Sequence, residues 1–428
     1  MSGNTSLDHL LDVMAGRRED TVPWLGALRE EARTLFANSG LPTRRVESWK
    51  YSDLSRALAR APEGLSPARP APVLPGTHLA LFENGVLNES KSALAEIGAV
   101  PLRQVLADPS TPFASKIGYV NPQKDHALLN LNTALMEDGL VLHVPAHTTL
   151  TAPLYIRYDW EGEEARAPEG RHLRIFILLD EGAEATLVEA HSGTPGFSTI
   201  VSELRLAAGA RLKHIRFDRL GAAARQSAIT LGELDAAASY KAFYLSEGGL
   251  FSRHEALLNL AEKDAQAELD GIYLVADGRH CDNTTVITHA GPDTASRQAF
   301  RGVLAGDSRG VYQGCVRVRP DAQGTDARQM SRTVLLSRQA EIAIKPELEI
   351  LADNVKCSHG ATSGELDTAA LFFLRARGIP EAEARALLIE AFLGEVLEAI
   401  ESEPLRACAA AAVADWLAIH AGEIAHVE

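Results

Sequence analysis

The stretch from Leu140 to about Val355 constrains the fold most, because short runs of alternating apolar and polar residues recur through it. Glycine-containing turns separate these runs, without the tight dipeptides of a hairpin, and long helical patterns are nearly absent. Many short strands with small-residue turns are typical of a sandwich, a barrel or a β-solenoid. The pattern favours a solenoid, in which each coil buries its apolar face on the next, although no strict period is visible. The clearest runs are APLYIRY, HLRIFILL, LRLAAGARLKHIRF, DNTTVITH and AEIAIKPELEI.

Helical patterns precede this region. Within residues 1–56, apolar residues fall at helical spacing, and Gly40 and Pro42 end the second predicted helix. Trp49 and Tyr51 then lie two apart in the block ESWKYSDL. We interpret them as aromatic side chains that anchor the end of a helix.

A mixed segment completes a predicted N-terminal domain of residues 1–139. Five prolines between residues 57 and 76 predict an extended linker. Asn84 and Gly85 lie between two apolar runs and predict a β-hairpin, and leucines at helical spacing within 112–139 predict a further helix.

The strand-rich core, assigned to residues 140–360, is followed by a predicted C-terminal helical domain of residues 361–428. Asp367 can cap its first helix and Gly378 can end it, and Pro380 then opens a second helix that carries an apolar stripe. Either the chain's own body covers this stripe, or the stripe is a docking platform for another subunit. The residues of the stripe are Ala384, Leu387, Leu388, Ala391, Phe392, Val396 and Ala399.

The charge balance argues against two classes of partner. Lys and Arg number 42 and Asp and Glu number 57, which gives a net charge of -15 and argues against nucleic acid or an anionic membrane. The first twenty residues lack the pattern of a secretory signal, and no run of eighteen apolar residues predicts a membrane span. Four scattered cysteines do not form a disulfide framework, so we expect a cytoplasmic protein.

Catalytic motifs are missing from the sequence. It contains no GxxxxGK[ST] loop, no GxGxxG after a strand, no GxSxG elbow and no HExxH pair, so we expect a protein that is not an enzyme. Asp270, Asp277 and Asp282 in the strand region leave one alternative, a carbohydrate-cleaving solenoid. Acidic residues in turns are more often simply solvated.

The stretch LADNVKCSHGAT, residues 351–362, combines a thiol and an imidazole. If 348–359 is one extended strand, Cys357 and His359 point to the same face. This pair suits zinc, copper or an iron–sulfur cluster, but two ligands cannot complete a four-ligand site. Either the remaining ligands come from elsewhere, including a second protein, or Cys357 is a small core residue beside an unrelated histidine.

The longer block KPELEILADNVKCSHGATSGELDTAALFFLRARGI, residues 345–379, resembles the signature of the SufB/SufD family, the scaffold subunits of the Suf iron–sulfur cluster assembly machine. Two further blocks are similar to this family, LPTRRVESWKYSDL (41–54) and GVYQGCVRVRPDAQGTDARQMSRTVLLS (310–337). The ESWKY block, the chain length and the lack of a cysteine-rich N-terminal motif resemble the SufD branch more than the SufB branch.

The resemblance implies a mainly β fold, a right-handed parallel β-helix core flanked by N- and C-terminal helical domains. It also implies a non-catalytic scaffold of the SufBCD complex, with a role in iron acquisition and transfer. SufB would pair with the β-helix, and the SufC ATPase would dock on the C-terminal helices 367–401. A homodimer of the isolated chain is a further alternative.

The resemblance assigns the metal-binding role to His359 and Cys357, as ligands of iron or of a nascent cluster at the SufB–SufD interface. The cluster would be transient and shared with the partner, and we expect none tightly bound to the isolated chain. The alternative is a purely structural partner that positions SufB and SufC without ligating iron.

Overall fold

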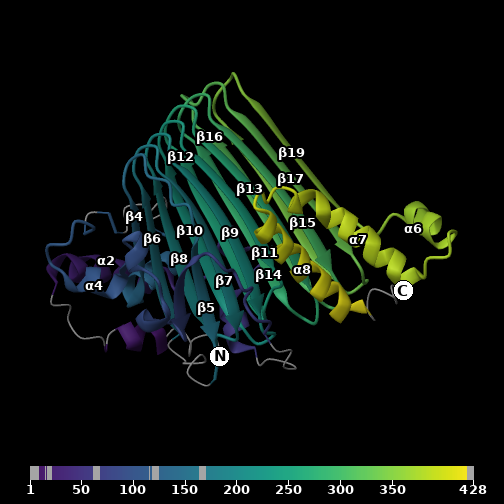
Figure 1. Cartoon of the computed structure of the whole chain (residues 1–428), viewed down its shortest axis with the longest axis horizontal. Coiled ribbons are helices and arrows are strands. Elements are labelled where there is room, and N and C mark those ends of the chain that lie inside the picture. The colour runs from purple at the N-terminus through teal and green to yellow at the C-terminus, as the bar shows by residue number, and fades with distance from the viewer. Residues whose placement is uncertain are drawn as a thin grey trace.

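The computed structural model describes residues 9–14, 16, 22–60, 68–114, 116–117, 125–162 and 170–421. Its core is a parallel β-solenoid with helices at both ends, which confirms the mainly β architecture that the family resemblance predicts (Figure 1). None of the described helices has the length and apolar character needed to span a membrane.

Two long sheets form the solenoid, and the chain alternates between them. Sheet A has the strand order β19-β17-β15-β13-β11-β9-β7-β5-β1-β2, and sheet B has the order β18-β16-β14-β12-β10-β8-β6-β4-β3. Each coil therefore contributes one strand to each sheet, and neighbouring coils pair in parallel. The strands are β1 (His78–Glu83), β2 (Val86–Leu87), β3 (Val100–Pro101), β4 (Asp138–Val144), β5 (Leu154–Trp160), β6 (Arg171–Leu179), β7 (Glu184–Gly193), β8 (Ser198–Leu206), β9 (Arg211–Leu220), β10 (Arg225–Leu234), β11 (Ser239–Ser246), β12 (Phe251–Leu260), β13 (Gln266–Val275), β14 (His280–His289), β15 (Ala295–Leu304), β16 (Arg309–Val318), β17 (Asp326–Leu335), β18 (Glu341–Ile350) and β19 (Lys356–Gly364).

Coil length varies along the solenoid, and this explains why the sequence shows no strict period. Arg225 pairs with Phe251, 26 positions later, whereas Asp138 pairs with Leu173, 35 positions later. The strands keep similar lengths, so the turns absorb the difference. Sequence periodicity fades when the turns vary, although the strand ladder itself stays regular.

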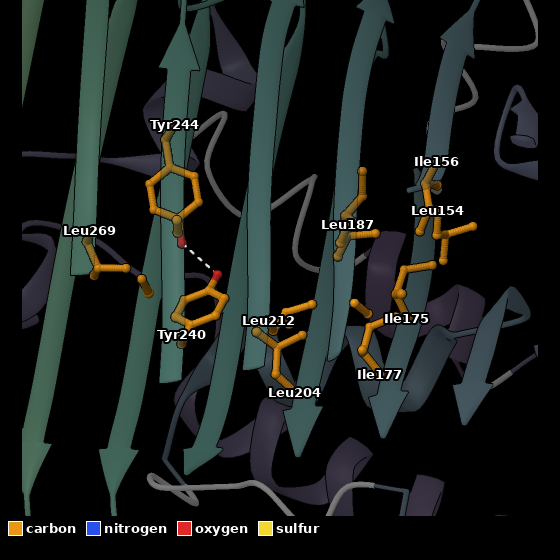
Figure 2. Packing of buried hydrophobic residues seen from close by; sticks show 14 of the residues in the cluster. Leu154, Ile156, Ile175, Ile177, Leu187, Leu204, Leu212, Tyr240, Tyr244 and Leu269 are labelled. Atoms are coloured by element: carbon orange, nitrogen blue, oxygen red, sulfur yellow. Dashed lines mark hydrogen bonds between the residues drawn. The ribbon is translucent and has the colours of Figure 1, made fainter. Parts of the chain in front are cut away.

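Alternate side chains of every strand point into the solenoid and pack between the two sheets. Leu154, Ile156 and Leu187 from sheet A meet Ile175 and Ile177 from sheet B in a continuous apolar layer (Figure 2). This inward and outward alternation is the pattern that the sequence shows, and burial of the inward set stabilises each coil on the next.

The N-terminal helices cover the outer face of sheet B. Two sequence predictions are confirmed here: α2 ends at Gly40 in a positive-φ conformation, and Asn84 and Gly85 both adopt positive φ in the hairpin between β1 and β2. The proline-rich segment starts inside a helix, because α3 runs to Ala59, and the carbonyl of Pro72 accepts a hydrogen bond from the Tyr155 hydroxyl on β5. The elements on this side are α2 (Pro23–Ser39), η1 (Glu47–Trp49), α3 (Leu54–Ala59), α4 (Leu102–Ala107) and α5 (Ala127–Leu135). The short helices η2 (Glu89–Lys91) and η3 (Ala95–Ile97) lie beside the first coil, where Ile97 joins the interior cluster.

The C-terminal helices lie on the opposite side, against the outer face of sheet A (Figure 1). Asp367 caps α6 (Thr368–Arg375) through the amides of Ala369 and Ala370, as the sequence predicts. α7 (Glu381–Leu397) and α8 (Glu403–Ile419) pack on sheet A, whereas α6 extends away from the solenoid.

Candidate functional site

Cys357 and His359 lie on β19, the last strand of sheet A. The expected single strand over 348–359 is wrong, because residues 351–355 form the turn between β18 and β19. The two residues nevertheless lie two apart on one strand and share a face, as alternation requires. That face is set by β19 alone and not by the residues before the turn.

The register identifies the face as the inner one. Cys357 pairs with Ala327 and His359 pairs with Gln329 on β17. Gln329 is buried and its amide donates to the Tyr312 hydroxyl in the apolar interior. His359 therefore occupies the interior position of the terminal coil, yet it is exposed because no described coil follows to cover it.

The two side chains have different surroundings. Cys357 is half-buried against a small apolar cluster that includes Ala327 and Val318, and burial raises the pKa of its thiol. His359, by contrast, is exposed to solvent. The arrangement gives one accessible imidazole and one thiol that favours its protonated form, both at the uncovered end of the solenoid.

No complete metal site exists within the described ranges, since no group of three or more His, Cys, Asp or Glu side chains there is arranged to hold a metal ion. The other cysteines are dispersed. Cys281 and Cys315 are buried on β14 and β16, and Cys408 is half-buried on α8. The chain thus presents at most a partial ligand set at β19.

The three acids considered for carbohydrate cleavage do not share a groove. Asp270 lies on β13 in sheet A and forms an ion pair with Arg297, at 2.8 Å. Asp282 lies on β14 in sheet B and accepts a hydrogen bond from Ser52. Asp277 lies in the turn between these strands. The structure does not bring the three carboxylates together, so this alternative lacks its site.

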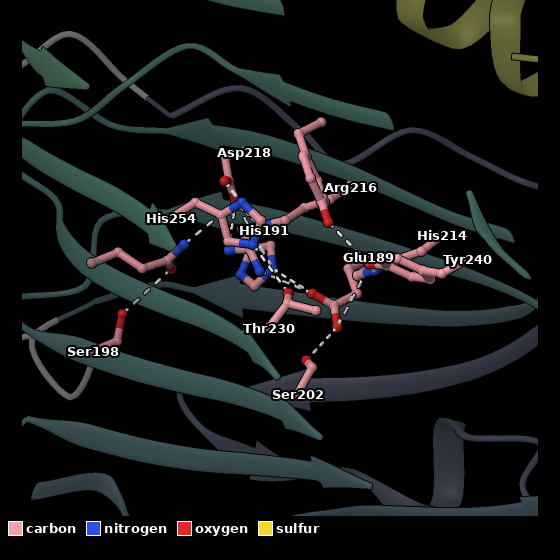
Figure 3. A network of polar contacts seen from close by, with 12 residues as sticks. Glu189, His191, Ser198, Ser202, His214, Arg216, Asp218, Thr230, Tyr240 and His254 are labelled. Atoms are coloured by element: carbon pink, nitrogen blue, oxygen red, sulfur yellow. Dashed lines mark hydrogen bonds and ion pairs between the residues drawn. The ribbon is translucent and has the colours of Figure 1, made fainter. Parts of the chain in front are cut away.

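Sequence reasoning missed a buried polar network inside the solenoid, which we call the interior network: Glu189, His191, His214, Arg216, Asp218 and His254 (Figure 3). Arg216 donates from Nη1 to Glu189 at 3.0 Å and from Nε to Asp218 at 3.0 Å. The Ser202 hydroxyl donates to the second oxygen of Glu189 at 3.0 Å. One guanidinium thus joins carboxylates from β7 and β9.

The charges of the interior network follow from its burial. Burial lowers the pKa of the three imidazoles, to about 4 for His214 and about 3 for His254, so they are neutral at pH 7. Burial acts to raise the pKa of Glu189, but the hydrogen bond from His191 and the charges of its neighbours, Arg216 among them, outweigh burial and lower it. Arg216 is therefore the cation that holds two buried carboxylates ionised at neutral pH.

A sequence signal for this network existed. Polar residues occur at alternate positions in EAH (189–191) and HIRFD (214–218), on the face that the flanking leucines place inside the solenoid. Buried charges must be paired, so two such runs one coil apart indicate an internal ion network.

The ESWKY block forms a strap across the outer face of sheet B. Trp49 is buried and stacks on Phe251, as the anchoring interpretation requires, and the Arg253 guanidinium lies 4.3 Å from the Trp49 ring centroid. Glu47 forms an ion pair with Lys345 on β18, at 2.6 Å. The strap therefore reaches from the middle of the solenoid to its terminal coil.

The C-terminal helices are held to sheet A by apolar contacts and ion pairs. Ile389, Leu393 and Val396 of α7 pack into the cluster on sheet A, and Glu395 pairs with Arg301 of β15. Of the predicted stripe, Ala384 and Val396 are buried, Leu388 and Phe392 are half-buried, and Ala391 and Ala399 are exposed, so the chain's own body covers only part of it. Leu387 remains exposed.

The largest exposed apolar side chains of this part lie instead on α6. Phe372 is 74% exposed and Phe373 is 54% exposed. Both belong to the helix that extends away from the solenoid (Figure 1). A pair of exposed aromatic side chains on one short helix marks an interaction surface.

Comparisons with known proteins agree with the fold and with the quoted motifs. Residues 161–392 match the family model described as "SUF system FeS cluster assembly, SufBD core domain", and residues 12–62 match the SufBD protein N-terminal region. The iron–sulfur cluster assembly SufBD family protein slr0076 of Synechocystis is 29% identical, over 90% of this chain and 89% of its own length.

Two further relatives show the same extent of similarity. The chloroplastic protein ABCI7 of Arabidopsis thaliana is 29% identical over 93% of this chain and 87% of its own length. The iron–sulfur cluster assembly protein SufD of Escherichia coli is 28% identical over 86% of this chain and 87% of its own length. The core model alone spans more than half of the sequence, and the chain therefore belongs to the SufBD family of SUF-system iron–sulfur cluster assembly proteins.

Proposed function

We propose that the chain is a non-catalytic, cytoplasmic scaffold that pairs with SufB through the terminal coil of its solenoid and docks the SufC ATPase through its C-terminal helices. A nascent iron–sulfur cluster forms on the shared face between the two solenoids. His359 and Cys357 supply this chain's part of the ligand set, and the cluster is cargo that the complex passes on together with its iron.

One observation carries this proposal: the exposed His359 occupies an interior position on a coil that no described strand covers. Among the described strands, β18 and β19 each have a neighbour on one side only and so end their sheets. An open strand edge is a template for pairing with another chain. A partner that pairs there brings its own ligands next to His359, which completes the partial site.

The first prediction is that His359→Ala lowers cluster formation by about tenfold or more in the complex reconstituted with SufB and SufC, because an exposed ligand is lost without a packing change. Iron and acid-labile sulfide are measured anaerobically on the purified complex. Ser358→Ala is the matched control, since Ser358 is exposed on the adjacent position of β19 and faces the other way. An unchanged cluster yield in the His359 variant would disprove the ligand role.

Because Cys357 is half-buried against apolar neighbours, its proposed ligand role is tested separately against the structural alternative, in which it only packs. If Cys357 only packs, Cys357→Ala weakens assembly of the complex, and the complex that does form contains normal iron. If it ligates the cluster, assembly is normal and iron falls. Native mass spectrometry of the complex together with iron analysis separates the two results.

The second prediction concerns the exposed surface of α6. The double change Phe372→Ser and Phe373→Ser is expected to weaken binding of SufC by about tenfold or more, since central aromatic side chains dominate interface energies. The free energy of unfolding stays unchanged because both rings are exposed. Calorimetric titration with SufC measures the affinity, and Val73→Ser, which removes an apolar side chain 84% exposed elsewhere, is the control. Equal affinities would assign SufC to another surface.

A further inference from the structure

A cavity of about 510 Å³ lies between the outer face of sheet A and the junction of α7 and α8. The floor comes from β9, β11 and β13, and the roof comes from residues 399–402 and Leu405. Cavities of this size hold small organic ligands. Nothing in the cluster site or the α6 surface described above uses this cavity.

Asp270 contributes an unsatisfied hydrogen-bond acceptor to the cavity. It lines the cavity from β13, and its residue is 3% exposed. One carboxylate oxygen, Oδ2, accepts from Arg297 at 2.8 Å. The other, Oδ1, is buried and has no hydrogen-bond partner among the described residues. A buried carboxylate oxygen without a hydrogen-bond donor costs the fold free energy. A ligand that places a donor there gains binding free energy from the hydrogen bond that the fold leaves unmade.

Two lysines supply the opposite charge in the same cavity. Lys213 and Lys241 are register neighbours on β9 and β11, and both line the cavity. Glu401, from the α7–α8 junction, accepts from Lys213 at 2.6 Å and from Lys241 at 3.3 Å. Lys241 also forms an ion pair with Glu268 at 3.6 Å, and because each ammonium has three donors, both lysines retain capacity for a further acceptor. A ligand carboxylate would share these lysine donors with Glu401 or displace Glu401 from them.

The remaining walls are mixed, with Thr151, Thr186, Ser402 and Glu268 beside four apolar side chains. Ile215 and Phe243 lie on the sheet side, and Ile400 and Leu405 lie on the helix side. The cavity therefore offers a carboxylate with a free lone pair, a pair of ammonium groups and an apolar portion of its wall. This combination matches one chemical class.

We propose that this cavity binds a free amino acid with an apolar side chain. The ligand ammonium donates to Asp270 Oδ1, its carboxylate accepts from Lys213 and Lys241, and its side chain packs between Phe243 and Leu405. Because the ligand carboxylate competes with Glu401, binding loosens the contact between the α7–α8 junction and sheet A.

The pH dependence of binding follows from the groups that face Asp270: Arg297, Glu268 and Lys241 from sheet A, and Glu401 from the helices. Burial raises the pKa of Asp270 to about 6 against the pull of Arg297. His214 also borders the cavity, but its imidazole belongs to the interior network on the other face of β9, and burial lowers its pKa to about 4, so it is neutral in this range. Only the ionised carboxylate attracts an ammonium, and binding is therefore expected to weaken as the pH falls through about 6.

The third prediction tests this site with the full chain. The standard L-amino acids are screened one by one at millimolar concentration by thermal melting, and the best binder is titrated by calorimetry. Asp270→Asn is expected to weaken its binding by about tenfold or more, because a charged hydrogen bond is lost. Glu401→Gln is expected to tighten it by roughly threefold, because the internal competitor loses its charge.

Controls make each outcome decisive. Lys263→Gln removes an exposed lysine that pairs with Asp293 outside the cavity, and should leave the affinity unchanged. The amine and the acid that correspond to the best amino acid, each lacking one charge, should bind more weakly than the amino acid. The proposal is overturned if no amino acid raises the melting temperature, or if Asp270→Asn and Glu401→Gln shift the affinity in the same direction.

Discussion

Replacing Arg216 by methionine is expected to lower the free energy of unfolding by about 3–5 kcal/mol. The guanidinium is buried and pairs with Glu189 and Asp218, so its removal leaves two carboxylates inside the solenoid without a counter-charge. Chemical denaturation at pH 7 measures the loss. Arg211→Met on the same strand is the matched control, since Arg211 is exposed and pairs with Glu184 at the surface, and it should cost well under 1 kcal/mol.

The pH dependence of this loss distinguishes the lost charge from lost packing. In the wild type the pKa of Asp218 is lowered, because the attraction of Arg216 outweighs the effect of burial. The Arg216–Asp218 pair therefore stabilises the fold at pH values above 3.8, the pKa of the carboxyl in the unfolded chain. Without Arg216, burial raises the pKa of both carboxyl groups. Protonation then removes the free-energy cost of burying two unpaired negative charges. The difference between variant and wild type should therefore shrink as the pH falls from 7 to 5. A pH-independent difference would mean that the side chain acts by packing alone.

The sequence allowed local elements to be predicted where one residue determines the backbone. The hairpin at Asn84 and Gly85, the end of α2 at Gly40 and the cap at Asp367 are such cases. Each depends on neighbours in the chain and on little else. The alternation of the core strands was visible for the same reason.

Features that depend on the stacking of coils could not be predicted. The break between β18 and β19 at 351–355 carries no strong turn dipeptide, and only the pairing of Lys356 with Asp326 shows where the new strand begins. The inward direction of His359 likewise follows from its pairing with Gln329 and not from its own neighbours. The interior network was not predicted because each polar run, taken alone, resembles the solvent-exposed face of a strand. Only the neighbouring coil shows that these side chains lie inside the solenoid.

The C-terminal stripe shows a further limit. A helix pattern indicates which face is apolar, but not what covers it. Sheet A covers Leu393 and Val396, while the exposed aromatic residues lie on α6, a helix too short for its pattern to stand out. The expected docking surface, helices 367–401, includes these exposed aromatic residues, and its role as a dock for SufC stays a prediction.

Replacing Arg253 by methionine is expected to have the other large effect, again about 3–5 kcal/mol, and to release the strap that contains the ESWKY block. Arg253 is fully buried on β12 and pairs with Glu255 and Asp282. It also donates to the carbonyl of Ser48 at 2.9 Å and lies over the Trp49 ring. The change removes a polar anchor of the strap and leaves two buried carboxylates without their guanidinium partner.

Two variants identify the cause of this loss. Arg328→Met, on an exposed arginine of β17 that pairs with Asp326, should leave the free energy of unfolding nearly unchanged. Adding Asp282→Asn to Arg253→Met should recover part of the loss, because one of the unpaired charges disappears. If the double variant is no more stable than Arg253→Met, unpaired charge is not the cause.

The consequence should extend to the terminal coil, because the strap also contacts later strands. The side-chain amide of Gln313 on β16 donates to the Ser48 carbonyl at 3.1 Å, and Lys345 on β18 pairs with Glu47. Hydrogen exchange in Arg253→Met is therefore expected to quicken both at residues 47–54 and along β18, next to the strand that carries His359. Faster exchange at 47–54 with unchanged exchange along β18 would show that the strap anchors only itself, and that the terminal coil keeps its order without it.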